Sequence, residues 1–195
     1  MAWSRWRQRV RDYADITNVG PIIRRYFVIG AFDGALTILG VVIGAFVAGA
    51  SEADKPLVLA ASLSAGIGLA ISSAVGAYEA ERVEKKLDQY TIERAMLTKM
   101  SEEHRDAFRF AAVLSALVHG IAPLIAAIVP IVPFYFLDVR SATVAAITVT
   151  LLLLFIIGTY LGRLVRDRFF LTGLRFVAAG LGTAVLLWLL GPFAR

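Results

Sequence analysis

The chain has 195 residues, of which 58% are hydrophobic and 18% charged, and its mean hydropathy is +0.73. A soluble protein of this length has too little core to bury so much apolar surface, so these values predict a multi-spanning membrane protein. The absence of cysteine excludes disulfides and thiolate metal sites. The net charge is +5, and the basic residues cluster beside the hydrophobic segments. Their expected partner is therefore the anionic headgroups of lipids and not nucleic acid.

A basic segment, residues 1–20, opens the chain with arginines interleaved among Trp3, Trp6 and Tyr13. This pattern predicts an amphipathic helix on the cytoplasmic membrane surface, with tryptophan toward lipid and arginine toward headgroups. A partly ordered basic tail is the alternative. Gly20 and Pro21 are expected to break the segment before the first span. The polar residues after the arginines exclude a signal peptide.

The first predicted span covers residues 26–50 and contains a single charged side chain, Asp33. At a rise of ~1.5 Å per residue, this helix can cross a hydrocarbon core ~30 Å thick. Asp33 lies well inside the span, where an uncompensated carboxylate costs on the order of 3 kcal/mol of insertion free energy. A small and polar face surrounds it at helical spacing, formed by Gly30, Gly34, Thr37 and Gly44. We therefore expect Asp33 to point into the bundle and to form half of an ion site.

The second predicted span covers residues 56–78 and carries a small residue at every fourth position. These residues predict a face for tight helix packing; they are Ser64, Gly68, Ser72 and Gly76. Good helix formers continue beyond Tyr78, so the span is expected to project from the membrane as a charged helix. Ser101 is a suitable N-cap for a second, short helix, which completes a charged hairpin over residues 79–107.

The third hydrophobic segment, residues 108–137, is too long for one straight span and contains His119 followed by Gly120. Three prolines interrupt it, at positions 123, 130 and 133, and Pro123 frees the carbonyl group of His119 from its helical hydrogen bond. Backbone broken at membrane depth is tolerated where it is buried in protein or lines a cavity. Residues 108–137 are therefore a second candidate source of metal ligands.

The fourth and fifth spans are expected at residues 142–161 and 171–191, which gives an all-α membrane protein with five transmembrane helices. Lysine and arginine gather in the N-terminal segment, in the hairpin and in the loop between spans four and five. The opposite side carries Lys55, Arg140 and Arg195. This asymmetry predicts a cytoplasmic N-terminus and hairpin, with the C-terminus outside.

The first and third segments can be aligned so that Asp33-Gly34 meets His119-Gly120. Both spans would enter the membrane from the same side, as in the parallel repeats whose interfaces hold the sites of many transporters. A chance match between two apolar helices is the alternative. On this alignment His119 stands opposite Asp33, and the hypothesis is a site near the membrane midplane that contains Asp33 and includes His119 as a candidate ligand.

Candidate metal ligands occur in the spans and in the hairpin: Asp33, His119, Glu79, Glu81, Glu84, Glu93 and Met96. Asp33 is either a functional carboxylate or a structural one bonded to a neighbouring helix, and His119 either a ligand or a satisfied core residue. In the hairpin, Glu81, Glu84 and Asp88 share one helical face, and Glu93, Met96 and Met100 share another. Carboxylates with a thioether suit Fe²⁺, and oxygen ligands suit Mn²⁺ or Mg²⁺ equally. The alternative is an ordinary solvated helix whose acids alternate with lysine and arginine.

Catalysis has no support, because no nucleophile-and-base motif, HExxH sequence or glycine-rich phosphate loop is present. We therefore expect a protein that is not an enzyme and has no resident cofactor.

Four segments resemble the vacuolar iron transporter family. FDGALTILGVVIGA, residues 32–45, is similar to the family's first helix, and AISSAVGAYEAERVE, residues 70–84, to its second-span ending. Ser73 and Ala77 stand where the family has methionine and glutamate. IVPIVPFYFL and LTGLRFVAAGLGTAVLLWLLG are similar to the third-span ending and the final helix.

The resemblance implies a five-span homodimer that exchanges Fe²⁺ or Mn²⁺ for protons, with a cytoplasmic metal-binding domain after span two. Asp33 would be the translocation carboxylate, and Glu79 or Glu81 would replace the missing glutamate. The short hairpin would be a reduced metal-collecting domain, in a divergent prokaryotic member that exports metal across the cell membrane. The alternative is a membrane protein that transports nothing and whose hairpin binds a partner or lipid.

Overall fold

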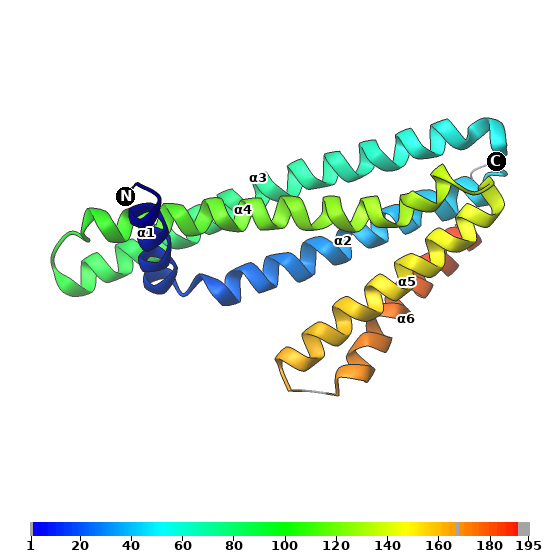
Figure 1. The fold of residues 1–195 in the computed structure, drawn as a ribbon. Coiled ribbons are helices and arrows are strands. Elements are labelled where there is room, and N and C mark those ends of the chain that lie inside the picture. The colour runs from blue at the N-terminus through cyan, green and yellow to red at the C-terminus, as the bar shows by residue number, and fades with distance from the viewer. Residues whose placement is uncertain (1, 167, 191–195) are drawn as a thin grey trace.

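The computed structural model describes residues 2–166 and 168–190, which form an elongated, all-α bundle (Figure 1). Its helices are α1 (Ala2–Thr17), α2 (Val19–Val47), α3 (Lys55–Met96), α4 (Glu102–Ile131), α5 (Val139–Leu164) and α6 (Phe169–Leu190), with 3₁₀ turns η1 (Glu52–Asp54) and η2 (Val132–Tyr135). Within these residues, 5 helices are long and apolar enough to cross a membrane, as predicted. Gly191, the predicted end of the fifth span, and Arg195 lie outside the described residues.

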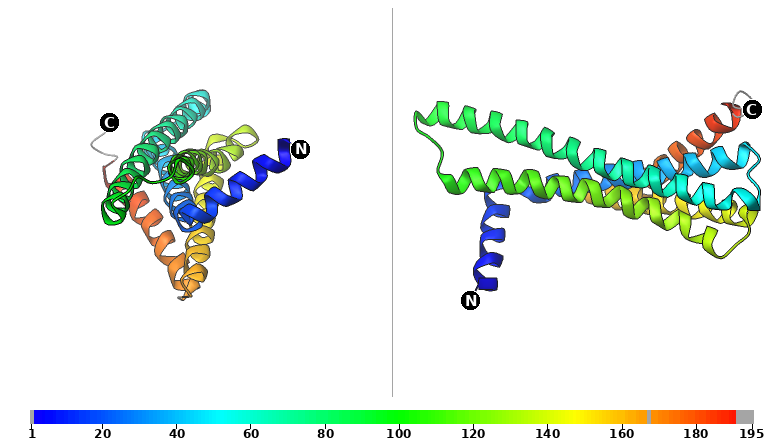
Figure 2. Two further views of the ribbon diagram at one scale, coloured as in Figure 1. Left: turned by 90° about the vertical axis from the view of Figure 1, so that its left-hand side faces the viewer. Right: turned by 90° about the horizontal axis from the view of Figure 1, so that it is seen from above.

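The N-terminal segment is helical, and α1 runs across the long axis of the bundle (Figure 2). Tyr13 anchors it, with its ring centroid 5.9 Å from that of Phe110 on α4. The predicted break at Gly20 and Pro21 is wrong. The chain turns at Asn18, which has left-handed backbone angles of φ 44° and ψ 47°, and Pro21 lies in the first turn of α2. There its missing N–H removes no helical hydrogen bond.

The charged hairpin is built from extensions of two spans. The predicted projection of span two is confirmed, because α3 runs without a break from Lys55 to Met96. The prediction of a separate short helix after Ser101 is wrong. Ser101 caps α4, its Oγ accepting from the backbone N–H of His104 at 3.5 Å, and α4 continues directly into the third span.

The third span is also less broken than expected. Pro123 and Pro130 lie inside α4, which continues as an α-helix to Ile131 before the 3₁₀ turn η2. Each proline removes one backbone hydrogen bond, and the neighbouring helices supply enough packing to keep the helix continuous.

Helix α4 is the centre of the bundle, with α2 running parallel to it on one side and α3 antiparallel on another (Figures 1 and 2). Glycines allow both contacts. A Cβ atom on Gly34 would lie 2.6 Å from the Cα of Pro123, and one on Gly30 would lie 2.8 Å from the Cδ of Pro123. On the α3 side, a Cβ on Gly120 would lie 2.9 Å from that of Ala74. In lipid, where helices gain nothing from burying apolar surface, this close backbone approach is what holds them together.

The small face predicted on span two does not make the contact within the chain. Its members, Ser64, Gly68, Ser72 and Gly76, are all exposed. Helix α3 packs instead through the buried residues Val58, Ser62, Gly66, Ala70, Ala77 and Glu81. Within the span, the buried face carries Ser62, Gly66 and Ala70, which are as small as the residues of the exposed face, so their spacing alone did not distinguish the two faces.

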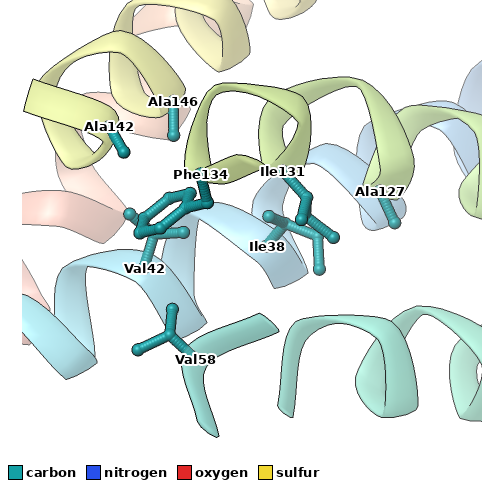
Figure 3. Close-up of a cluster of buried hydrophobic side chains, with 8 residues drawn as sticks. All are labelled: Ile38, Val42, Val58, Ala127, Ile131, Phe134, Ala142 and Ala146. Atoms are coloured by element: carbon teal, nitrogen blue, oxygen red, sulfur yellow. The ribbon is translucent and has the colours of Figure 1, made fainter. Parts of the chain in front are cut away.

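The end of the bundle opposite the hairpin is closed by a cluster of buried side chains (Figure 3). Phe134 of η2 is 1% exposed and lies among Ile38 and Val42 of α2 and Val58 of α3. Ala127 and Ile131 of α4 and Ala142 and Ala146 of α5 complete the cluster. This apolar plug ties together five elements: α2, α3, α4, η2 and α5.

Replacing Gly34 by alanine tests the contact between α2 and α4. The added methyl group would meet the backbone of Pro123, so we expect a loss of about 1–3 kcal/mol of stability, measured as a lowered melting temperature in detergent. Gly44→Ala in the same helix is the control, because a Cβ there meets nothing within 4 Å. It should be neutral or stabilising. Equal melting temperatures for the two variants would contradict this description of the contact.

Candidate metal site

Asp33 lies on α2 between the two glycines that contact α4, and it is half-buried. Across residues 2–166 and 168–190 it has no hydrogen bond or ion pair, and its electrostatic neighbour is His119 on α4. The structural alternative for Asp33 required an arginine or hydroxyl partner on a neighbouring helix. The described part of the chain supplies no such partner.

His119 is oriented by the backbone of α2. Its Nδ1 lies 3.0 Å from the carbonyl oxygen of Tyr26. A carbonyl oxygen only accepts hydrogen bonds, so Nδ1 carries the proton and donates it. In the neutral ring the lone pair is then on Nε2, which can bind a metal ion or a proton. Histidine ligands in metalloproteins are commonly oriented by such a bond from the other ring nitrogen.

The carbonyl group freed by Pro123 also belongs to this contact. A Cβ on Gly30 would lie 3.1 Å from the carbonyl oxygen of His119 and 3.1 Å from its Nδ1. The proximity of Asp33 and His119 therefore rests on direct packing of the two helices, and the freed carbonyl lies at the same place.

Glu81 is 3% exposed and forms an ion pair with Arg25 at 2.9 Å. The guanidinium of Arg25 lies 5.0 Å from the ring centroid of Tyr26, and Tyr26 interacts with the same carboxylate. The rings of Tyr26 and His119 have their centroids 5.0 Å apart. Polar groups thus follow one another from the hairpin end of the bundle to Asp33.

The other predicted hairpin ligands do not converge. Glu79 pairs with Arg82 at 2.6 Å in its own helix, Glu84 is exposed, and Met96 is 64% exposed. Among the described residues, no group of three or more His, Asp or Glu side chains could hold a metal ion. Within one chain, the hairpin therefore offers separate acids rather than a chelating site.

Glu93 closes the hairpin instead of facing a ligand. It accepts hydrogen bonds from Gln89 Nε2 at 2.8 Å and from the backbone N–H of Met100 at 3.0 Å. It also pairs with Arg105 on α4 at 3.3 Å. The bond from Gln89, followed by those from Met100 and Arg105, holds the pKa of Glu93 below its ordinary value.

Three residues near the site were not among the predicted ones: Arg25, Tyr26 and Ser115. The sequence shows that Arg25 is a charged residue at the start of a span. Its pairing with Glu81 depends on how α2 packs against α3, which the sequence does not show. Ser115 is fully buried one turn before His119, and its Oγ has no hydrogen-bond partner in the described part of the chain. A serine in an apolar helix carries no such signal.

Comparisons with known proteins decide the family. The sequence profile of the VIT family matches residues 24–108 and 93–192, which together cover most of the chain and at least part of every span. The chain belongs to the VIT family. A protein of Methanocaldococcus jannaschii, itself described as uncharacterized, is 33% identical over 171 residues, covering 85% of this chain and 87% of its own length. VIT is the vacuolar iron transporter family, so the predicted membership is confirmed, and it identifies the chain as a multi-pass membrane protein of a metal-transporting family.

The lowered pKa of Glu93 makes the hairpin sensitive to acid. Ionised Glu93 stabilises the closed hairpin above pH ~4.3, where a free glutamate ionises, and this contribution is lost as the pH falls through the lowered pKa. The chain has no cysteine, so a spin label on Thr98→Cys reports the mobility of the turn. We expect mobility to rise on acidification in the parent chain, and to be high at all pH values in Glu93→Gln.

The control for that experiment is Glu84→Gln, because Glu84 is exposed and lies outside the hairpin contacts. It should behave like the parent chain. A spin label that is equally immobile in Glu93→Gln and in the parent at neutral pH would show that Glu93 does not hold the hairpin closed.

Proposed function

We propose that the chain is a transporter of Fe²⁺ or Mn²⁺ that exchanges the metal for protons and exports it from the cytoplasm. The observation that carries the proposal is Asp33, an acid within a membrane span that has no cationic partner in the described residues and lies beside His119. A membrane protein retains such a group where a cation needs it. Family membership supports iron or manganese as the substrate.

The transport site consists of the Asp33 carboxylate, Nε2 of His119 and the carbonyl oxygen of His119 freed by Pro123. An oxygen-rich set with one imidazole suits Mn²⁺ and Fe²⁺. Metal binding requires ionised Asp33 and an unprotonated Nε2, so protons that enter from the outer side displace the metal. Because the metal ion and the protons compete for the Asp33 carboxylate and for Nε2 of His119, the outward flux of metal is coupled to the inward flux of protons.

A second copy of the chain completes the site. Asp33 and His119 are two side chains, fewer than the ligands that Fe²⁺ or Mn²⁺ needs. The exposed small face of α3 supports a homodimer, because residues spaced like Ser64, Gly68 and Ser72 let two helices approach closely in lipid. Residues from both copies would then surround the ion.

The hairpin end faces the cytoplasm in this proposal. The N-terminal helix α1, the hairpin and the loop between α5 and α6 gather toward one end of the bundle (Figure 1). These are the segments richest in lysine and arginine, which favours that end as the inner side. Glu79 and Glu84 collect metal there by attraction at the surface.

Asp33→Asn tests the transport site directly. The amide keeps the size of the side chain but cannot ionise, so we expect Mn²⁺-driven proton flux in proteoliposomes to fall to the background of empty vesicles. Asp12→Asn is the control, because Asp12 is exposed on α1, and its flux should equal that of the parent. Unchanged flux in a folded Asp33→Asn protein would remove Asp33 from the mechanism.

Binding can be measured separately from transport. A ligand that binds only the folded chain stabilises it by about 2.7 kcal/mol at 100 times its Kd. We expect Mn²⁺ to raise the melting temperature of the parent in detergent, with little effect on Asp33→Asn and a smaller effect on His119→Gln. Absence of stabilisation by Mn²⁺ or Fe²⁺ in the parent would favour the membrane protein that transports nothing.

A further inference from the structure

Two cavities lie along the junction between α3 and α4 and share two lining residues. One, of about 500 Å³, lies in the hairpin; the other, of about 340 Å³, lies at the depth of the spans. Tyr78 and Val113 line both. The two cavities are therefore consecutive along the helices, one polar and one apolar.

The hairpin cavity has a cationic wall. Its charged lining residues are Arg82, Lys85, Lys86, Arg105 and Arg109, and no acidic residue lines it. Several of these cations pair with carboxylates, such as Arg109 with Asp106 at 3.5 Å, but those carboxylates are not part of the lining. Each of these cations uses one or two of its hydrogens in such pairs, and the remaining guanidinium and ammonium hydrogens are left for another acceptor.

Arg105 adds an independent sign of an absent acceptor. Its guanidinium nitrogens pair with Glu93 at 3.3 Å and Glu102 at 3.0 Å. Its Nε is shielded from solvent and has no hydrogen-bond partner in the described residues. A shielded N–H of a charged group is costly when unpaired, so an acceptor in this cavity would satisfy it.

The second cavity is an apolar groove. It runs along α3 from Ala70 to Tyr78 and along α4 from Val113 to Leu124, and Ile71, Leu117 and Ile121 in its walls are exposed. At ~1.5 Å per residue, the α3 side is about 12 Å long. An exposed apolar groove of this form accommodates one hydrocarbon chain.

The junction of the two cavities lies at the level of the membrane surface. Helix α1 crosses the bundle there, packing through Tyr13 on Phe110 of α4, between Arg109 and Val113 (Figure 2). Tyr78 is a residue type that collects at the interface between headgroups and acyl chains. The cationic cavity is then at headgroup depth and the groove at acyl depth.

We propose that the junction of α3 and α4 binds one anionic phospholipid of the cytoplasmic leaflet, its phosphate in the cationic cavity and an acyl chain in the groove. Charge complementarity selects the headgroup, and the adjoining apolar groove selects a lipid over a soluble phosphate. Because Glu93 and Arg105 hold the same hairpin closed, the lipid ties the hairpin to the membrane surface. This site differs from the one at Asp33 and is independent of metal transport.

The test uses the full chain in detergent, titrated with phosphatidylglycerol or phosphatidylcholine and examined by native mass spectrometry. Lys86→Gln with Arg109→Gln removes two charges from the cavity. Arg94→Gln with Lys99→Gln removes two exposed charges from the tip of the same hairpin, outside the cavity lining, and is the matched control. Near a membrane surface each basic residue contributes ~1 kcal/mol, so we expect the cavity variant to bind phosphatidylglycerol about 10–30 times more weakly and the control to bind like the parent.

Three results would overturn the proposal. Equal affinity for phosphatidylglycerol and phosphatidylcholine would show that the cationic wall selects nothing. Glycerophosphate that displaces phosphatidylglycerol at equal concentration would identify a soluble anion as the ligand. A disulfide between two copies carrying Leu117→Cys, with no bound lipid, would show that a second chain covers the groove.

Discussion

The contact between the backbones of α2 and α4 sets the geometry on which the rest of the structure depends. Gly30 and Gly34 remove the side chains that would keep the helices apart, and α4 presents Pro123 and the carbonyl group of His119 to them. Asp33 lies between the two glycines, so the same contact brings the carboxylate beside the imidazole. Packing and chemistry therefore cannot change independently in this part of the chain.

Two acidic side chains of the bundle, Glu81 and Asp33, differ in how their negative charge is compensated. Glu81 is buried and paired with Arg25 at 2.9 Å, which neutralises it where water is scarce. Asp33 has no such partner among the described residues, although it lies deeper in its span. Desolvation is tolerable for Glu81 because of arginine. Among the described residues Asp33 has no arginine or lysine partner, and in the proposed function a metal ion or a proton takes that place.

Features that depend on hydropathy and on local capping could be predicted from the sequence. Features that depend on which helix surfaces face each other could be predicted less well. The five spans, the projection of α3 and the cap at Ser101 were predictable because each depends on neighbouring residues. The exposed face of α3 was mistaken for the packed one, since both are rows of small residues. The pairing of Glu81 with Arg25 joins residues 56 positions apart, so only the arrangement of helices could reveal it.

The distribution of charge in the hairpin limits what it can do for a metal ion. Glu81 pairs with Arg25 of α2 and Glu93 with Arg105 of α4; the other acids are exposed or paired within their own helices, whereas the hairpin cavity is lined by cations. A divalent cation is repelled from that interior, so collection by chelation between α3 and α4 is unfavourable within one chain. The outer acids can still raise the local concentration of metal by long-range attraction, which salt weakens over a Debye length of ~8 Å. Attraction outside and anion binding inside are then compatible roles of one hairpin, because its exposed acids lie outside the cavity and no acid lines the cavity itself.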